Sequence, residues 1–381
     1  MKIVVLMDSL KGSLSSMEAG EAVREGILST IKDAEVSVYP FADGGEGSLE
    51  VFLRADGNSH KVCVHVSDPL GRPVDAYYGV LSDGTVVVEI AQAAGLCRLS
   101  PEERNPLVTS TRGVGELIRH AAENGYRSFL VALGGSATND CGLGMLRALG
   151  YEFTDDQNQP VAEGAQGLSD VCSVNDENVL SSLGECTFLI AGDVSNPLYG
   201  EQGASAVFGP QKGASKEDVI QMDLWMRRFA KIVQERYPNA DPMAAGTGAA
   251  GGLGFAFRTF LGGEFHPGAQ MLLHKTGLEQ EIASSDLVIT GEGRIDAQTV
   301  MGKAPIRIAQ AAKKYGKPVI AIAGCLGDGA KECLAHGIDL IIPAVAGPKA
   351  DVKDLEHDRA TENIRCAATE AMEQFRKFPR R

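Results

Sequence analysis

Five short segments of this 381-residue chain combine glycine with acidic residues and with a hydroxyl or amide side chain. Each follows an apolar run that is typical of a buried strand. Backbone N–H groups and cations bind phosphate, Mg²⁺ prefers carboxylate and phosphate oxygens, and a reacting hydroxyl needs a carboxylate beside it. Phosphoryl transfer depends mainly on positioning and charge, so these residue types are sufficient for it. The segments are residues 8–13, 42–48, 134–144, 192–198 and 290–296.

The charged residues of these segments each have an ordinary structural explanation as well. A surface ion pair would account for Asp8 with Lys11, and turn or capping roles for Asp43 with Glu46. An Asx turn would account for Asp193. An internal ion-pair network would account for the last set, which comprises Glu292, Arg294 and Asp296. Turns alone do not explain why all of them follow strands, and ligands of open α/β sheets collect at the carboxyl ends of strands.

Several common motifs are absent from the sequence. There is no GxxxxGK[ST] phosphate loop, no GxGxxG after the first strand, no HRD or DFG pattern and no GxSxG. The seven histidines have no partner acids at metal-ligand spacing, so we assign them no catalytic or metal role. The glycine-rich run at 248–254, which includes Gly251 and Gly252, is explained equally well by tight helix packing.

The composition restricts the class of protein. Lys+Arg 36 against Asp+Glu 50 gives a formal charge of −14, which disfavours nucleic acid as a partner. Eight cysteines without a CxxC pair indicate reduced thiols. The apolar N-terminal run is too short for a signal peptide or a membrane span, and no later segment reaches about 18 uncharged apolar residues. We expect a soluble cytoplasmic protein with no membrane partner.

The hydrophobic pattern predicts an α/β fold with two domains. Residues 2–7 and 36–39 are predicted strands around a helix that ends near residue 31, which indicates parallel pairing. Residues 61–67 and 74–81 alternate around a turn, so a mixed sheet is expected there. A strand at 287–289, followed by a loop at 290–296, restores the β-α-β pattern. We predict a discontinuous domain of residues 1–60 plus 285–381 and an inserted domain of residues 61–284.

Seven sets of residues, in order along nearly the whole chain, resemble the type I glycerate kinase family. They are Asp8–Ser15, Ala42–Gly47, Gly134–Asp140, Gly192–Asp193 with Asn196–Leu198, Gly209–Gly213, Gly248–Gly254, and Thr290–Asp296 with Gln298–Thr299 and Gly302–Pro305. One departure is Cys141, where a glycine or another small residue is expected.

The resemblance implies a kinase that moves the γ-phosphoryl group of ATP, with Mg²⁺, onto D-glycerate. The 2-hydroxyl group is the expected acceptor, which gives 2-phosphoglycerate in sugar-acid or glyoxylate catabolism. The resemblance also implies that the discontinuous domain is Rossmann-like, with a parallel sheet, and that a cleft separates the two domains. The chain is expected to be a monomer or a homodimer.

The residue roles combine the chemistry with the resemblance. Lys11 is expected to neutralise the transferring phosphate, and Asp193 to contact the substrate hydroxyl as base or orienting group. Asp296 is a second candidate for the base or for a metal ligand. Substrate binding is assigned to Asp8, Asp43, Glu46 and Arg294, with Arg294 on the glycerate carboxylate. Asp43 and Asp193 are the candidate Mg²⁺ ligands. Nucleotide binding is assigned to Gly134, Gly135, Ser136, Thr138, Asn139, Gly251 and Gly252.

Rival functions remain open at this point. The same residues would suit a kinase that gives 3-phosphoglycerate or acts on another small hydroxy acid. A non-catalytic regulator that binds a hydroxy acid would keep the two-domain architecture without turnover. A nicotinamide-dependent reductase is disfavoured by the missing GxGxxG.

Overall fold

The computed structural model describes residues 1–10, 12–42, 44–45, 47–192, 194–345 and 356–376. Four predicted site residues, Lys11, Asp43, Glu46 and Asp193, lie outside these described residues. Contacts within the chain divide it into two units, one of residues 1–43 with 269–381 and one of residues 44–268. The predicted arrangement, a discontinuous unit with another unit inserted into it, is confirmed.

The two boundaries between these units, after residues 43 and 268, lie earlier in the chain than those predicted at 60/61 and 284/285. Helix α2 (Ser48–Ala55) packs on strands of the inserted unit, and helix α10 (Leu278–Ser284) packs against strand β1 (Lys2–Met7) of the first unit. The predicted boundaries stay a prediction about which pieces fold independently.

The first unit is built on a five-stranded sheet in the order β13-β12-β11-β1-β2, and every neighbouring pair is parallel. This sheet and the helices around it confirm the predicted β-α-β pattern. Besides β1 and α10, the elements are β2 (Glu35–Pro40), β11 (Leu287–Ile295), β12 (Val319–Leu326), β13 (Leu340–Pro343), α1 (Ser16–Thr30), α11 (Ala304–Lys314), α12 (His357–Phe375), η6 (Thr299–Met301) and η7 (Ala330–His336).

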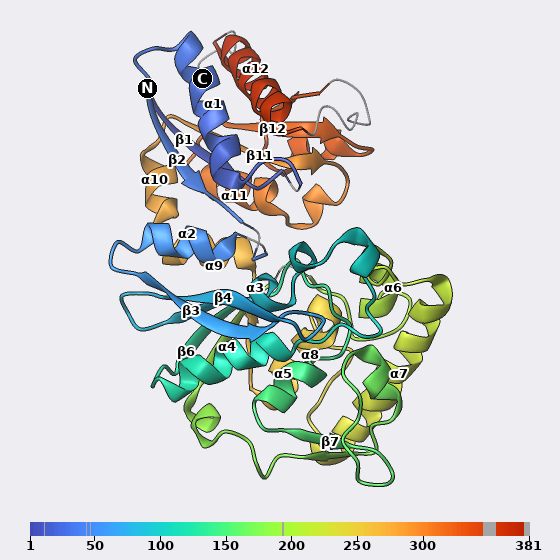
Figure 1. Ribbon diagram of the computed structural model, residues 1–381. Coiled ribbons are helices and arrows are strands. Elements are labelled where there is room, and N and C mark those ends of the chain that lie inside the picture. The colour runs from blue at the N-terminus through green and yellow to red at the C-terminus, as the bar shows by residue number, and fades with distance from the viewer. Residues whose placement is uncertain (11, 43, 46, 193, 346–355, 377–381) are drawn as a thin grey trace. The chain divides into compact units, whose positions relative to one another are not determined.

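Helices α1 and α12 lie side by side and pack together on the sheet (Figure 1). Ile3, Val5 and Met7 alternate along β1 and share one buried cluster with apolar residues of both helices. A capping box of Ser15 and Glu18 begins α1, which fixes where the chain leaves the loop after β1.

Strand β11 corrects one prediction. The sequence was expected to leave the sheet after residue 289, because residues 290–296 contain two glycines and three charged side chains. The strand instead continues to Ile295, with Arg294 opposite Cys325 of β12. A Cβ atom at Gly291 would collide with the carbonyl of Ile322, so the glycine permits close strand pairing rather than a loop.

The inserted unit contains a mixed six-stranded sheet in the order β10-β9-β6-β5-β4-β3. The β3–β4 and β4–β5 pairs are antiparallel and the others parallel, which confirms the hairpin predicted over residues 61–81. The strands are β3 (His60–Ser67), β4 (Pro73–Val80), β5 (Val86–Glu89), β6 (Ser128–Ala132), β9 (Thr187–Ala191) and β10 (Glu264–His266), with a separate pair of β7 (Glu152–Thr154) and β8 (Ser173–Asn175).

Helices cover both faces of this sheet. The phenol of Tyr78 lies 3.1 Å from Nδ1 of His120 on α4, whereas a Cβ atom at Gly79 would meet Leu49 of α2. Successive strand residues point to opposite faces, so α2 and α4 lie on opposite sides. The remaining helices of this unit are α3 (Ala91–Ala94), α4 (Arg112–Glu123), α5 (Leu143–Ala148), α6 (Ala204–Phe208), α7 (Lys216–Arg236), α8 (Ala249–Phe260), η1 (Leu96–Arg98), η2 (Pro101–Glu103), η3 (Ala165–Ser169), η4 (Ser181–Glu185) and η5 (Pro210–Lys212). Helix α9 (Gly268–Lys275) belongs almost wholly to the first unit.

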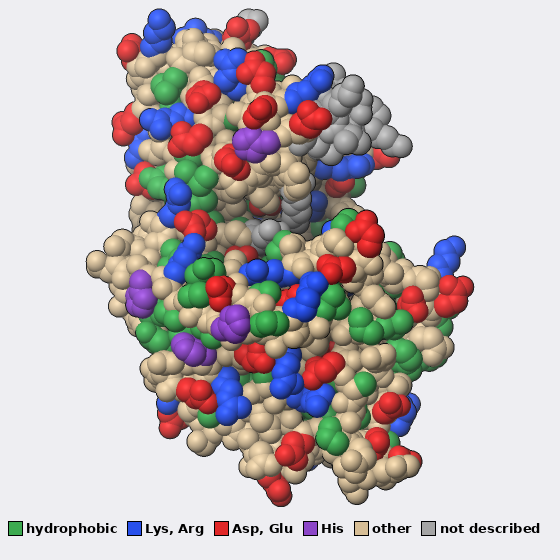
Figure 2. Space-filling model, viewed as in Figure 1, with side chains coloured by type: hydrophobic (Ala, Val, Ile, Leu, Met, Phe, Trp, Pro, Cys, Tyr) green, Lys and Arg blue, Asp and Glu red, His purple; other side chains and the backbone are tan. Residues whose placement is uncertain are grey.

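Positive and negative side chains are interspersed on the face of the molecule shown in Figure 2. That pattern differs from the concentrated basic face that is typical of nucleic-acid binding. In the part of the chain that the structure describes, no helix is both long enough and apolar enough to cross a membrane.

Candidate functional site

The carboxyl edge of the parallel sheet positions Asp8. This residue directly follows β1, and its backbone N–H donates to the carbonyl of Gly291 on the neighbouring β11, at 2.9 Å. Its carboxylate accepts a hydrogen bond from the N–H of Ser9 at 2.7 Å, and the residue is 8% exposed. Asp8 therefore lies beside the middle of β11, whose second half carries Glu292 and Arg294.

The side chain of Ser16 ties two strand ends to the start of α1. Its hydroxyl donates to the carbonyl of Met7 at 2.7 Å and accepts from the N–H of Phe41 at 2.8 Å. Both loops that begin at these strand ends, 8–15 and 41–48, carry predicted site residues. One half-buried hydroxyl therefore fixes where both loops begin.

Glu292 takes part in an internal network at the end of β11. Its carboxylate accepts from the hydroxyl of Thr299 at 2.7 Å and lies 3.5 Å from the Nζ atom of Lys303. The hydroxyl of Thr299 in turn accepts from the N–H of Asp296 at 3.1 Å. Glu292 therefore belongs to an internal network, in agreement with the structural role that the sequence analysis offers for it.

Arg294 and Asp296 form an ion pair at the same sheet edge, with 3.2 Å between Nε and Oδ2. The Arg294 side chain is 56% exposed and that of Asp296 is 19% exposed. A guanidinium group that is held on one side and open on the other can receive a carboxylate by two parallel hydrogen bonds.

Residues 134–140, which we call the glycine loop, divide into an accessible tip and a buried stem. Gly135 at the tip is exposed and Gly134 is half-buried, whereas Ser136 is 6% exposed. Thr138 and Asn139 in the stem are fully buried. The tip is open to a ligand, whereas the side chains of the stem are withdrawn from solvent.

The stem of the glycine loop leads into α5, whose start is capped by Asp140. This carboxylate accepts from the N–H groups of Gly142 and Gly144, and from both the N–H and the hydroxyl of Thr111 at 2.9 Å. Burial raises the pKa of Asp140 above its usual value. The donors at the helix start are therefore already used.

Five backbone N–H groups of the glycine loop stand out by contrast. Those of Gly135, Ser136, Thr138, Asn139 and Asp140 make no hydrogen bond to any other residue that the structure describes. Buried N–H groups are nearly always paired in folded proteins, so these donors point to a ligand or to water. The sequence prediction of a phosphate-binding loop here is compatible with these free donors.

Lys212 is the residue that sequence reasoning missed. It ends η5, is 1% exposed, and donates from Nζ to the hydroxyl of Ser136 at 2.9 Å and to the carbonyl of Thr138 at 2.6 Å. Burial lowers the pKa of Lys212 to about 7, and the charge of Asp140 opposes this shift. The available signal was its position in the Gly209–Gly213 motif.

Gly251 and Gly252 lie against the stem of the glycine loop. Residues 250–252 of α8 have left-handed backbone angles, with φ of 51°, 67° and 91°. The carbonyl of Gly251 accepts from the N–H of Cys141 at 3.0 Å, and a Cβ atom at Gly251 would collide with the carbonyl of Thr138. The two glycines therefore permit a close backbone contact beneath the loop.

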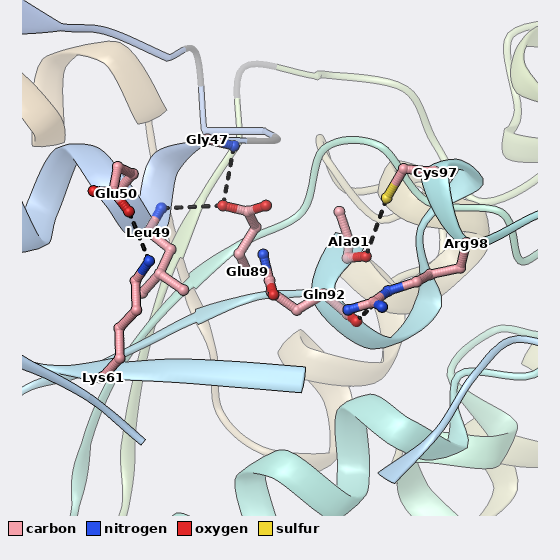
Figure 3. A pocket seen from close by; sticks show the side chains of 9 residues that line it. All are labelled: Gly47, Leu49, Glu50, Lys61, Glu89, Ala91, Gln92, Cys97 and Arg98. Carbon is pink, nitrogen blue, oxygen red and sulfur yellow. Dashed lines mark hydrogen bonds and ion pairs between the residues drawn. The ribbon is translucent and has the colours of Figure 1, made fainter. Parts of the chain in front are cut away.

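A cavity of about 400 Å³ opens in the inserted unit (Figure 3). The carboxylate of Glu89 is 2% exposed and accepts from the N–H groups of Gly47 and Leu49 at 3.1 and 3.0 Å. It thereby holds the start of α2, directly after the predicted site loop 42–48. The lining residues are Gly47, Leu49, Glu50, Lys61, Glu89, Ala91, Gln92, Cys97 and Arg98.

The described residues contain no group of three or more His, Cys, Asp or Glu side chains that could hold a metal ion. The predicted Mg²⁺ ligands, Asp43 and Asp193, are outside that search. Magnesium in phosphoryl-transfer sites is commonly held by one or two carboxylates together with substrate phosphates. The Mg²⁺ assignment therefore stays a prediction.

Comparison with known proteins gives a consistent result. The profile of the glycerate kinase family matches residues 3–376. A protein named glycerate kinase from Haemophilus influenzae is 42% identical over 346 residues, 91% of each chain. A protein named glycerate 2-kinase from Escherichia coli K12 is 41% identical over 342 residues, 90% of each chain. A solved structure from Salmonella typhimurium LT2, described as a candidate glycerate kinase 2, is 41% identical with a TM-score of 0.80, and the match covers 99% of this chain and 98% of that one.

Proposed function

This chain belongs to the glycerate kinase family, and on that premise we propose that it transfers the γ-phosphoryl group of ATP to the 2-hydroxyl group of D-glycerate. The products would be 2-phosphoglycerate and ADP. The observation that carries the choice of hydroxyl is the 41% identity, over 90% of both chains, to a relative named glycerate 2-kinase.

The reaction needs one bond made and one broken. The oxygen of the 2-hydroxyl attacks the γ-phosphorus, the bond from that phosphorus to the bridging oxygen of ADP breaks, and the hydroxyl proton leaves. In the proposal Asp193 accepts this proton, with Asp296 as the second candidate, and Lys11 neutralises charge on the transferring group. The ion pair with Arg294 would fix the orientation of the Asp296 side chain.

The glycine loop is proposed to bind the nucleotide. Gly134, Gly135 and Ser136 at its tip would contact phosphate oxygens directly. The buried Thr138 and Asn139 would present their backbone N–H groups and support the tip. Gly251 and Gly252 would serve the same site by allowing α8 to approach the stem.

Substrate and metal are assigned to the other acidic loops. Arg294 is proposed to hold the glycerate carboxylate, since its guanidinium group is more than half exposed beside Asp296. Asp8, Asp43 and Glu46 are proposed to position the substrate. Mg²⁺, when bound, would reduce the negative charge on the phosphate oxygens, and Asp43 with Asp193 would hold it.

The test is turnover with ATP, D-glycerate and Mg²⁺, with the product identified by ³¹P NMR. A 2-phosphoglycerate signal supports the proposal. A 3-phosphoglycerate signal would keep the kinase and overturn the choice of hydroxyl. Absence of both a phosphorylated product and ADP would leave a protein that binds hydroxy acids without turnover.

We further propose that the protein works in the cytoplasm, in sugar-acid or glyoxylate catabolism, as a monomer or a homodimer. All eight cysteines are free, which suits a reducing compartment. Cell fractionation would test the location, and light scattering would test the oligomeric state.

A further inference from the structure

Lys212 places a buried ammonium group behind the glycine loop, and no step of the proposed transfer has used it. Its two hydrogen bonds join Ser136, which lies at the tip of the loop, to Thr138 in the stem. The side chain is 1% exposed, so this ammonium group is withdrawn from water.

Within the described residues, Lys212 has no ion-pair partner. Both of its acceptors are neutral oxygens, and Asp140, the acid whose charge acts on its pKa, directs its carboxylate to Thr111, Gly142 and Gly144. Burying an unpaired charge costs several kcal/mol, which an apolar side chain of the same length would avoid. When it is protonated, Lys212 therefore supplies a positive charge behind the loop that no described carboxylate pairs with.

The hydrogen bond from Lys212 to the carbonyl of Thr138 also fixes the orientation of the peptide group between Thr138 and Asn139. In a trans peptide the carbonyl and the following N–H point to opposite sides, so the N–H of Asn139 points away from Lys212. That N–H has no acceptor among the described residues. The buried Thr138 Oγ1 and Asn139 Oδ1 also lack a hydrogen-bond partner there. Several polar groups without a hydrogen-bond partner therefore lie at Thr138 and Asn139, next to the carbonyl that the Lys212 ammonium group binds.

We propose that Lys212 is a positioning residue for the nucleotide: its ammonium group holds the tip of the glycine loop against the stem and supplies positive charge behind the N–H groups that receive phosphate. This inference rests on the proposed function, because it assumes that the glycine loop binds ATP. It extends that function by adding a residue from η5 that does not itself belong to the loop.

A proton linkage follows from this arrangement. Without ligand, burial lowers the pKa of Lys212 to about 7, so much of the free protein lacks this charge near pH 8. Bound phosphate raises the pKa again, and binding must then take up a proton. The neighbouring groups are few: Asp140 acts from the loop, α6 contributes no titratable side chain, and Arg104 presents its carbonyl to Gly213.

The experiment is titration calorimetry of ATP with Mg²⁺ near pH 8, in two buffers of different ionisation heat and without glycerate. We expect the wild-type protein to take up as much as about one proton per ATP. Lys212→Met should abolish that uptake and weaken ATP binding about tenfold, while glycerate binding changes less than about twofold. Lys212→Arg should restore ATP affinity without proton uptake, because arginine stays charged.

Lys216→Met is the matched control, since Lys216 lies four residues further on and is exposed. It should behave as the wild type does. If Lys212→Met does not fold, proton uptake by the wild type, compared near pH 8 and near pH 6, decides instead.

The outcomes distinguish a failure of the role proposed for Lys212 from a failure of the proposed function on which it rests. Failure of the wild type to bind ATP would overturn the proposed function. ATP binding and glycerate turnover without proton uptake near pH 8, or with unchanged affinity in Lys212→Met, would overturn only the role of Lys212.

Discussion

At the scale of single residues, Asp193 carries the sharpest expectation about chemistry. Asp193→Asn keeps the size of the side chain but cannot accept a proton, so kcat should fall by about a hundredfold or more. Steady-state kinetics with a check of folding by circular dichroism measures this. Asp33→Asn, on an exposed residue, is the control. An unchanged kcat would remove Asp193 from the proton transfer.

Arg294 is expected to act on substrate affinity. Arg294→Lys keeps the charge but loses the two-pronged contact, so KM for glycerate should rise about tenfold while KM for ATP stays within about twofold. Arg24→Lys is a matched change on an exposed arginine of the same unit. Equal glycerate KM values in the two variants would contradict the assignment.

Lys212 should also affect how the free energy of unfolding depends on pH. Its pKa is about 7 in the folded state against an ordinary value of 10.5, so between these values the unfolded chain binds more protons. The contribution of Lys212 to the free energy of unfolding should therefore rise with pH above about 7, by on the order of 1 kcal/mol per pH unit at most.

Lys212→Met should lack this rise. Urea unfolding of both proteins near pH 7 and near pH 9 measures the difference, and parallel curves would contradict it. The raised pKa of Asp140 acts below this window, and those of Tyr78 and Tyr151, raised to about 12, act above it. Cysteines with raised pKa values, Cys141 among them, oppose the rise near pH 9 equally in both proteins, so the difference between the two proteins isolates Lys212.

At the scale of elements, the left-handed break in α8 is what lets this helix meet the glycine loop. Gly251→Ala would add a Cβ atom at φ 67° against the carbonyl of Thr138. Left-handed strain and the clash together should lower the free energy of unfolding by about 2–5 kcal/mol. Urea unfolding of Gly251→Ala measures the loss.

Gly57→Ala is the control for that change. Gly57 is exposed, has no left-handed φ, and nothing lies within 4 Å of its added Cβ atom. A loss in Gly57→Ala equal to that in Gly251→Ala would contradict the explanation by backbone contact.

The same elements show what the sequence could predict. Strands with strong apolar runs, such as 2–7, and the alternating hairpin over 61–81 match the structure closely. The extension of β11 through Gly291 was not predictable, because glycine usually signals a turn and here permits close pairing with β12. The burial of Lys212 was also hidden, since it depends on contact with residues 74 or more positions away.

At the scale of the whole molecule, the eight cysteines are predicted to react in distinct groups. Cys63, Cys97, Cys172 and Cys366 are exposed, whereas Cys141 and Cys333 are buried. Burial raises the pKa of Cys141 well above its usual value, so little reactive thiolate forms there despite its position after the glycine loop.

A thiol reagent should therefore modify four cysteines quickly in the native protein, and Cys141 only after denaturant is added. Mass spectrometry of digested protein identifies the sites. Cys141 serves as the internal marker of unfolding. Fast modification of Cys141 in native protein would contradict its burial.

The discontinuous first unit has a consequence for synthesis on the ribosome. Strand β1 lies between β2 and β11 in its sheet, but β11 begins only at Leu287. The residues of the inserted unit are all complete at position 268, so that unit can fold while β1 still lacks one neighbour. The nascent chain must therefore keep the apolar edge of Ile3–Met7 in β1 from aggregating for more than two hundred residues of elongation. During that period the unpaired edge is a binding site for a chaperone.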